Sequence, residues 1–150
     1  ISEKRIFIYG PNTSENEKIK KLLSENGFKE SNIAIDQNDT NLSNCDLFFI
    51  NNTNGEILPS KPKEKESPSH EDKKEYSDKS QEYESKWSEL RNKIGRPSSV
   101  FYYSEKGIVF PLDRIDDYNL KKRINFATNP ALIYGNLINS LKYQDKISKS

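Results

Sequence analysis

The sequence has few of the residues on which many site chemistries depend. It contains one cysteine, Cys45, and one histidine, His70, in 150 residues. A single cysteine excludes an internal disulfide and a cysteine-rich zinc site, and a single histidine argues against a histidine-based metal site. No apolar run approaches the roughly 20 residues that a membrane-spanning helix needs, and no signal peptide is visible. We therefore expect a cytoplasmic protein with no metal and no membrane contact.

The charge is also nearly balanced. Lys and Arg total 24, Asp and Glu total 23, and the formal net charge is +1. Nucleic-acid proteins that rely on bulk positive charge need an excess of Lys and Arg, so we do not expect a nucleic-acid partner. The length suits a single domain spanning residues 1–150. Because the chain starts at Ile1 rather than Met, we expect it to be part of a larger protein.

Short apolar runs predict a small set of buried strands. These runs are residues 5–9, 32–36, 46–50, 99–103 and 123–127. After the first of them, Ser14 and Glu17 have the spacing of a capping box, and Gly27 stands where a helix would end. Residues 108–110 follow a turn and predict a short hairpin strand. Asn129 and Pro130 predict the N-cap and first turn of a final helix.

A charged insertion interrupts this pattern. Residues 59–86 contain no aliphatic side chain. Three prolines predict a loop over residues 56–69, whereas an apolar stripe predicts a long helix over residues 70–94. The stripe consists of Tyr76, Tyr83, Trp87, Leu90 and Ile94. The alternative is a shorter helix over residues 82–94.

Alternation of buried strands with amphipathic helices indicates a parallel sheet that is covered on both faces. At this length the compact solution is an α/β three-layer, flavodoxin-like sandwich with strand order 2-1-3-4-5. Ligands of such sheets bind beyond the carboxyl ends of the strands, at the point where the strand order reverses. Here that point lies between the first and third strands.

The loops expected to meet at this crevice are rich in small polar residues. We predict a ligand-binding group there, which could hold a phosphate or nucleotide beside a helix N-terminus. Its members are Asn12, Thr13, Ser14, Asn52, Thr53 and Asn129. The alternative is that these residues only cap helices and form turns.

Two family resemblances accompany this layout. The predicted fold resembles receiver domains of two-component signalling, but Gly10-Pro11, Asn51-Asn52 and Thr128-Asn129 stand where a receiver has its acidic pair, phospho-accepting aspartate and lysine. This resemblance implies a pseudo-receiver without phosphotransfer chemistry.

The strands at residues 5–9 and 46–50, with Trp87-Ser88-Glu89-Leu90, also resemble TIR domains. That resemblance implies NAD as a substrate. It also implies Glu89 as the catalytic carboxylate, which stabilises the cationic sugar while nicotinamide leaves.

Three functions follow from these patterns. The first is a non-catalytic signalling or protein-interaction module, whose partner contacts Tyr76, Tyr83 and Trp87 on the long helix. The second is a TIR-like NAD-cleaving domain that uses Glu89. The third is a domain that senses a nucleotide in the polar crevice without turnover. The alternative for Glu89 is an exposed helix position. The alternative for the stripe is that Trp87 packs on the sheet and that Tyr76 and Tyr83 extend this contact.

Overall fold

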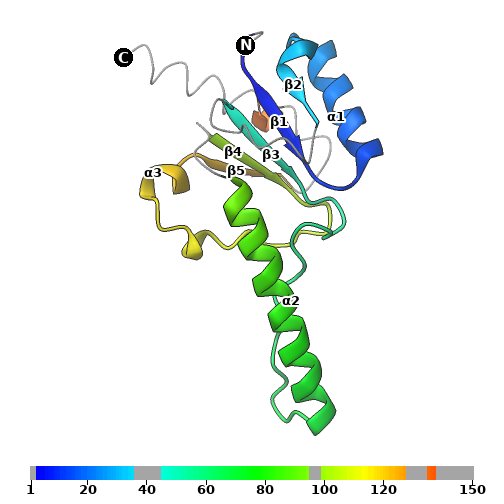
Figure 1. Cartoon of the computed structure of the whole chain (residues 1–150), viewed down its shortest axis with the longest axis vertical. Coiled ribbons are helices and arrows are strands. Elements are labelled where there is room, and N and C mark those ends of the chain that lie inside the picture. The colour runs from blue at the N-terminus through cyan, green and yellow to red at the C-terminus, as the bar shows by residue number, and fades with distance from the viewer. Residues whose placement is uncertain (1–2, 36–44, 95–98, 128–134, 138–150) are drawn as a thin grey trace.

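The computed structural model describes residues 3–35, 45–94, 99–127 and 135–137. Its centre is a five-stranded sheet with the order β2-β1-β3-β4-β5, and every neighbouring pair is parallel (Figure 1). The strands are β1 (Ile6–Tyr9), β2 (Ile33–Ala34), β3 (Leu47–Asn51), β4 (Ser99–Tyr103) and β5 (Ile124–Ala127). The α/β fold class and the strand order predicted from the sequence are thus confirmed.

Alternate residues along the strands face opposite sides of the sheet, and each side carries its own core. Helix α1 (Thr13–Glu25) covers one side, where Ile19 and Leu23 pack on strand residues such as Ile8 and Phe49. Helix α1 ends as Gly27 predicts, with a positive φ of 99° and the Phe28 N–H bonded to the Leu23 carbonyl. Phe28 folds back into the same core.

Helix α2 (His70–Ile94) covers the other side of the sheet with its second half. Its buried residues are Tyr83, Trp87, Leu90 and Ile94. They pack against the side chains of β1, β3 and β4 that alternate with those facing α1, such as Phe48 and Tyr102. The 25-residue helix has the bounds predicted from the stripe, so the shorter alternative is wrong. Ser69 and Asp72 form a reciprocal capping box at its start.

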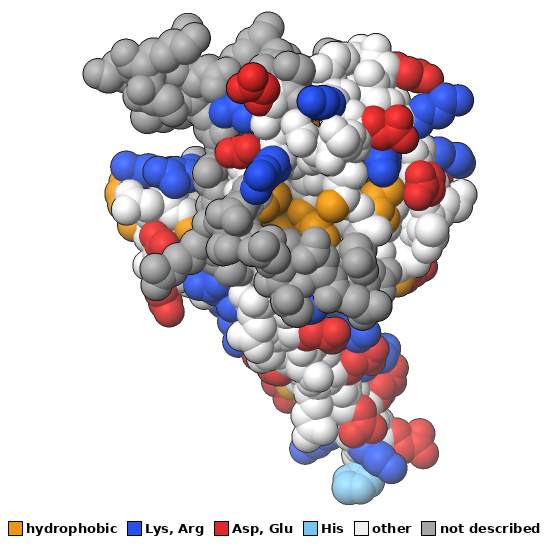
Figure 2. Space-filling model, turned by 45° about the horizontal axis from the view of Figure 1, so that its top comes forward, with side chains coloured by type: hydrophobic (Ala, Val, Ile, Leu, Met, Phe, Trp, Pro, Cys, Tyr) orange, Lys and Arg blue, Asp and Glu red, His pale blue; other side chains and the backbone are white. Residues whose placement is uncertain are grey.

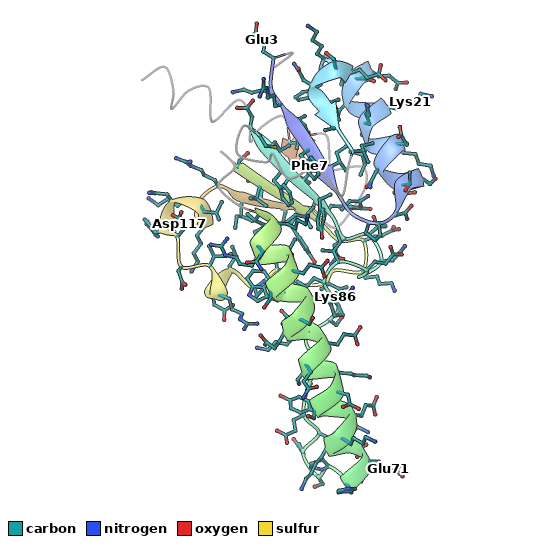
Figure 3. The ribbon with its side chains drawn as sticks, in the orientation of Figure 1. Glu3, Phe7, Lys21, Glu71, Lys86 and Asp117 are labelled. Carbon is teal, nitrogen blue, oxygen red and sulfur yellow. The ribbon has the colours of Figure 1, made fainter. Side chains whose placement is uncertain are left out.

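The first half of α2 projects away from the sheet together with the loop that leads into it (Figure 1). We call residues 60–80 the arm. None of them is buried, and only five are partly buried. Acidic and basic side chains are mixed along the arm (Figure 2), and Figure 3 shows Glu71 at its far end and Lys86 close to the sheet.

Three local predictions are wrong. The N-cap of α1 is Asn12 rather than Ser14, because the Asn12 side chain accepts from the Glu15 N–H. Residues 108–110 form no strand, since the Ile108 backbone bonds instead to the hydroxyls of Ser104 and Tyr102. The second strand has two residues rather than five.

The segment between β4 and β5 passes through two short helices, η3 (Leu112–Arg114) and α3 (Tyr118–Lys121). A further 3-10 turn, η1 (Glu30–Asn32), precedes β2. Most of the predicted final helix lies outside the described residues, but residues 135–137 are helical and Leu137 is buried in the core beside α1. No helix in the described ranges is long and apolar enough to cross a membrane.

Candidate functional site

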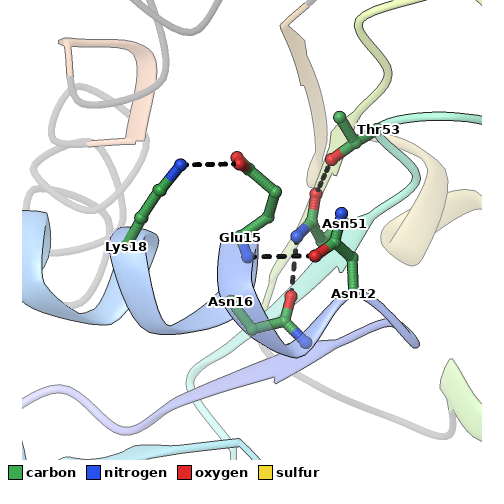
Figure 4. Close-up of polar contacts among 6 residues, drawn as sticks. All are labelled: Asn12, Glu15, Asn16, Lys18, Asn51 and Thr53. Carbon is green, nitrogen blue, oxygen red and sulfur yellow. Dashed lines mark hydrogen bonds and ion pairs between the residues drawn. The ribbon is translucent and has the colours of Figure 1, made fainter.

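A chain of buried amides occupies the carboxyl edge of β1 and β3, where the sequence predicted a crevice. The Asn16 amide donates to the Gly10 carbonyl at 2.9 Å, and the Asn51 amide donates to the Asn16 side-chain oxygen at 2.6 Å (Figure 4). The Thr53 hydroxyl donates in turn to the Asn51 side-chain oxygen. Asn16, Asn51 and Thr53 are all buried. Their polar groups therefore join α1 to the ends of both strands.

Asn52 has a comparable structural role in the loop after β3. It is fully buried, and its side-chain oxygen accepts from the N–H groups of Ile57 and Leu58. Its amide donates to the Leu58 carbonyl and to the Tyr102 hydroxyl, both at 2.8 Å. Because its side-chain amide and oxygen both have partners inside the protein, Asn52 holds this loop against β4.

The structure brings together only some of the predicted ligand-binding residues. Asn12 caps α1, Thr13 and Ser14 are exposed in its first turn, and Thr53 belongs to the buried amide chain. Asn129 lies outside the described residues. The sequence signal for Asn52 and Thr53 was correct about position, at the end of β3. The polar side chains of Asn52 and Thr53 form hydrogen bonds within the protein. None of the described contacts tests ligand binding at these residues, so ligand binding stays a prediction.

A pocket of about 120 Å³ lies at this edge beside the end of β1. It is lined by Tyr9, Gly10, Pro11, Glu56, Ile57, Lys86 and Glu89. Sites for drug-sized ligands occupy roughly 300–1,000 Å³, so this pocket suits only a small group or one end of a larger molecule.

Glu89 is exposed on α2 and reaches the rim of this pocket. Burial, together with the nearby Glu89 carboxylate, raises the pKa of Tyr9. Glu89 thus lies near the end of β1, the edge at which the TIR resemblance requires it. Asn52, the expected neighbour across the crevice, is not among the residues that line the pocket. Sequence reasoning missed Tyr9 and Lys86, although the position of Tyr9 as the last residue of β1 was a usable signal.

The three aromatic residues of the α2 stripe have different surroundings, because two of them pack on the sheet and the third lies on the arm. Tyr83 and Trp87 expose only 3% and 5% of their surfaces and belong to the core. Trp87 packs edge-on against Phe110, and the Arg114 guanidinium lies 5.9 Å from its ring centre. Neither Tyr83 nor Trp87 offers a free surface to a partner. Tyr76 is partly buried and lines a groove of about 200 Å³ on the arm, so partner contact through Tyr76 stays a prediction.

Cys45 is a structural thiol. It is buried, and its Sγ donates to the Leu47 carbonyl. Burial raises its pKa to about 11, so little thiolate forms near neutral pH. Among the described residues there is no cluster of three His, Cys, Asp or Glu side chains that could hold a metal ion.

Comparison with known proteins gives one finding. No curated protein and no solved structure matches the chain significantly. A family model does match, over residues 3–146, which include all five strands and both long helices. The chain therefore belongs to the family described as the Nucleotidyltransferase-Associated Rossmannoid Fold.

Proposed function

We propose that this domain is a non-catalytic protein-interaction module that acts in the cytoplasm beside a nucleotidyltransferase. The arm would carry the contact with the enzyme. The family description supports the choice of partner class. The free, buried thiol of Cys45 is compatible with a reducing compartment.

The arm is the observation that carries this proposal. Residues 60–80 form a defined structure, yet none of them is buried. Ordering a chain segment costs conformational entropy, and burial of apolar surface normally offsets that cost. The arm obtains little of this compensation from its own domain. A partner that covers the groove beside Tyr76 would provide it.

The arm is also stiff enough to present one surface. The capping box of Ser69 and Asp72 fixes the start of the helix, and Lys65 from the loop reaches Asp72 at 3.0 Å. Lys79 and Glu75 form a second ion pair at 2.7 Å. Each exposed pair contributes little to stability. The Lys65–Asp72 pair connects the loop to the helix, and the Lys79–Glu75 pair lies within the helix. A preorganised surface loses less entropy on binding.

The amide chain at the sheet edge supports the non-catalytic part of the proposal. The side-chain amides of Asn16, Asn51 and Asn52 all donate hydrogen bonds within the protein. No carboxylate stands at Gly10-Pro11 or Asn51-Asn52, where a receiver domain needs its acids. These observations favour a pseudo-receiver-like scaffold over an enzyme.

The test compares the wild type with an arm-less variant in which a short Gly-Ser linker replaces residues 61–79. Leu58 and Tyr83 are buried, so this replacement leaves the core intact. We expect the purified wild type to bind the nucleotidyltransferase encoded nearest to its gene, as measured by calorimetry. The arm-less variant should keep its melting temperature and lose binding. Equal binding by both proteins, or no binding by the wild type, would refute the proposal.

A second candidate function rests on the position of Glu89 near Tyr9. A TIR-like NAD hydrolase would use this carboxylate, and a nucleotide sensor would use the same pocket without turnover. Incubation with NAD, followed by chromatography for released nicotinamide, distinguishes the hydrolase from the sensor and from the interaction module. Turnover that is lost in Glu89→Gln and kept in Glu82→Gln supports the hydrolase. A rise in melting temperature with NAD or ATP, without turnover, supports the sensor.

A further inference from the structure

Tyr118 presents its ring to solvent from a helix that is firmly held. The side chain exposes 67% of its surface, although tyrosine rings usually pack. Helix α3 is fixed in place because Asp117 caps its first N–H groups and Leu120 is buried in the core. Figure 3 shows Asp117 on the side of the sheet, well away from the far end of the arm at Glu71. The exposure of Tyr118 is therefore a defined feature of the surface.

Three consecutive cations follow this ring. Lys121 and Lys122 stand three and four positions after Tyr118, which puts them on the same face of the helix. The Lys122 Nζ lies 4.2 Å from the centre of the Tyr118 ring. Lys121, Lys122 and Arg123 are exposed, and none of them forms an ion pair with a described residue. Arg114, in the preceding turn, differs because Glu84 neutralises it through two hydrogen bonds.

An exposed aromatic ring beside three cations that form no ion pair within the described part of the chain suits one class of ligand. A nucleobase can stack on the face of the ring opposite the Lys122 ammonium, and the phosphates on either side of the base can pair with the cations. We infer that Tyr118, Lys121, Lys122 and Arg123 form a binding site for single-stranded nucleic acid, which we call the α3 site. A duplex keeps its bases stacked on one another, so it would offer the ring no base face.

This inference differs from the expectation drawn from composition. The whole chain carries a net charge of only +1, whereas binding to phosphates depends on local charge. Acidic residues do lie close by, since Asp113, Asp116 and Asp117 precede the helix. The cap does not remove the negative charge of Asp117, so the carboxylates of all three aspartates oppose the binding of phosphates. We therefore expect modest affinity that falls steeply with salt.

The first experiment measures fluorescence anisotropy of a labelled 15-nucleotide oligo(U) titrated with the full chain at low and physiological salt. Loss of stacking in Tyr118→Ala should weaken binding by about 5- to 150-fold, which is the usual range for one stacked base. Tyr118→Phe should bind almost like the wild type because it keeps the ring. If Tyr118→Ala binds as tightly as the wild type, the α3 site is refuted.

The second experiment tests the cations. The double variant Lys121→Gln/Lys122→Gln should bind more weakly and reduce the slope of log K against log salt by about 0.7 for each lost phosphate contact. Lys73→Gln/Lys74→Gln makes the same charge change on the arm and should leave both quantities unchanged. Asp116→Asn should tighten binding, because it removes a nearby negative charge. Equal effects of the two double variants would show non-specific attraction and overturn the inference.

Competition identifies the ligand class. Unlabelled oligo(U) should displace the probe, whereas polyglutamate of equal charge, a duplex of equal length and free AMP should displace it poorly. Displacement by polyglutamate as effective as that by oligo(U) would instead indicate an acidic protein segment. Effective displacement by AMP would indicate a mononucleotide site, and effective displacement by duplex a general phosphate-binding surface. Each of these three results would refute the inference.

Discussion

The side-chain amide of Asn51, the last residue of β3, donates a 2.6 Å hydrogen bond to the side-chain oxygen of Asn16 in α1. Both residues are buried. The bond therefore fixes α1 against the carboxyl edge of the sheet, where an open polar crevice was expected. A buried polar group that loses its partner carries the full cost of its desolvation.

The first prediction concerns this bond. Asn16→Ala removes the acceptor of the Asn51 amide and the donor to the Gly10 carbonyl. We expect the free energy of unfolding to fall by about 1–3 kcal/mol, since the buried Asn51 amide loses the acceptor on Asn16. Urea denaturation followed by circular dichroism measures it. Asn54→Ala is the matched control, because Asn54 is exposed, and it should change stability by less than about 0.5 kcal/mol.

The fold was largely predictable from the sequence, but the use of the polar edge was not. Apolar runs predicted the strands, and the stripe on α2 predicted the bounds of that helix. The alternation of strands with helices then led to the flavodoxin-like strand order. The helical period puts Asn16 on the same face of α1 as Ile19 and Leu23, which indicates burial, but no sequence pattern indicates its hydrogen-bond partner. Only the packing of α1 on the sheet places its amide beside Asn51.

Sequence patterns were also insufficient to show which residues of the candidate sites are exposed. The spacing of Tyr83 and Trp87 indicates one helix face, and a face by itself does not reveal whether the sheet or a partner covers it. The answer depends on how far the sheet extends along α2, which is a tertiary property. Tyr118 carries no periodic signal, because its four-residue helix is too short to produce a period.

The second prediction uses the division of the stripe between core and arm. Trp87 packs on Phe110 in the core, whereas Tyr76 lies on the arm. Trp87→Ala should lower the free energy of unfolding by about 3–5 kcal/mol, and Tyr76→Ala by less than about 1 kcal/mol. Urea titrations of both variants test the difference. Equal losses would show that the arm is part of the cooperative core.

The third prediction concerns the close approach of β1 and β3 at Gly10. A Cβ added there would lie 2.8 Å from the Asn51 carbonyl oxygen and 3.3 Å from the Ile57 side chain. Gly10→Ala should therefore destabilise the fold by about 1–3 kcal/mol, because backbone must move to relieve the overlap. Gly135→Ala, which meets no atom within 4 Å, is the control and should be neutral or stabilising. Thermal melts of the two variants should move in different directions or by clearly different amounts.

The last prediction is a pH dependence that arises from Cys45. Burial raises its pKa from 9.0 to about 11, so the folded state holds the thiol proton more tightly than the unfolded state does. Below pH 9 both states are protonated, and the stabilisation from this group is fully present. Between pH 9 and pH 11 the unfolded chain releases the proton first, so the free energy of unfolding should fall by about 2–3 kcal/mol.

Urea denaturation of the wild type and Cys45→Ala at half-unit steps from pH 8 to pH 11 measures this effect. Buried tyrosines such as Tyr102, whose pKa is also raised by burial, lower stability at high pH in both proteins and cancel in the difference. The difference between the two curves should shrink or reverse as the pH rises through this range. Parallel curves would contradict the prediction, because they would mean that Cys45 has the same pKa in the folded and unfolded states. Thiol reactivity gives a second test. We expect the native protein to react slowly with a disulfide reagent at pH 8, and a rapid reaction would contradict the prediction as well.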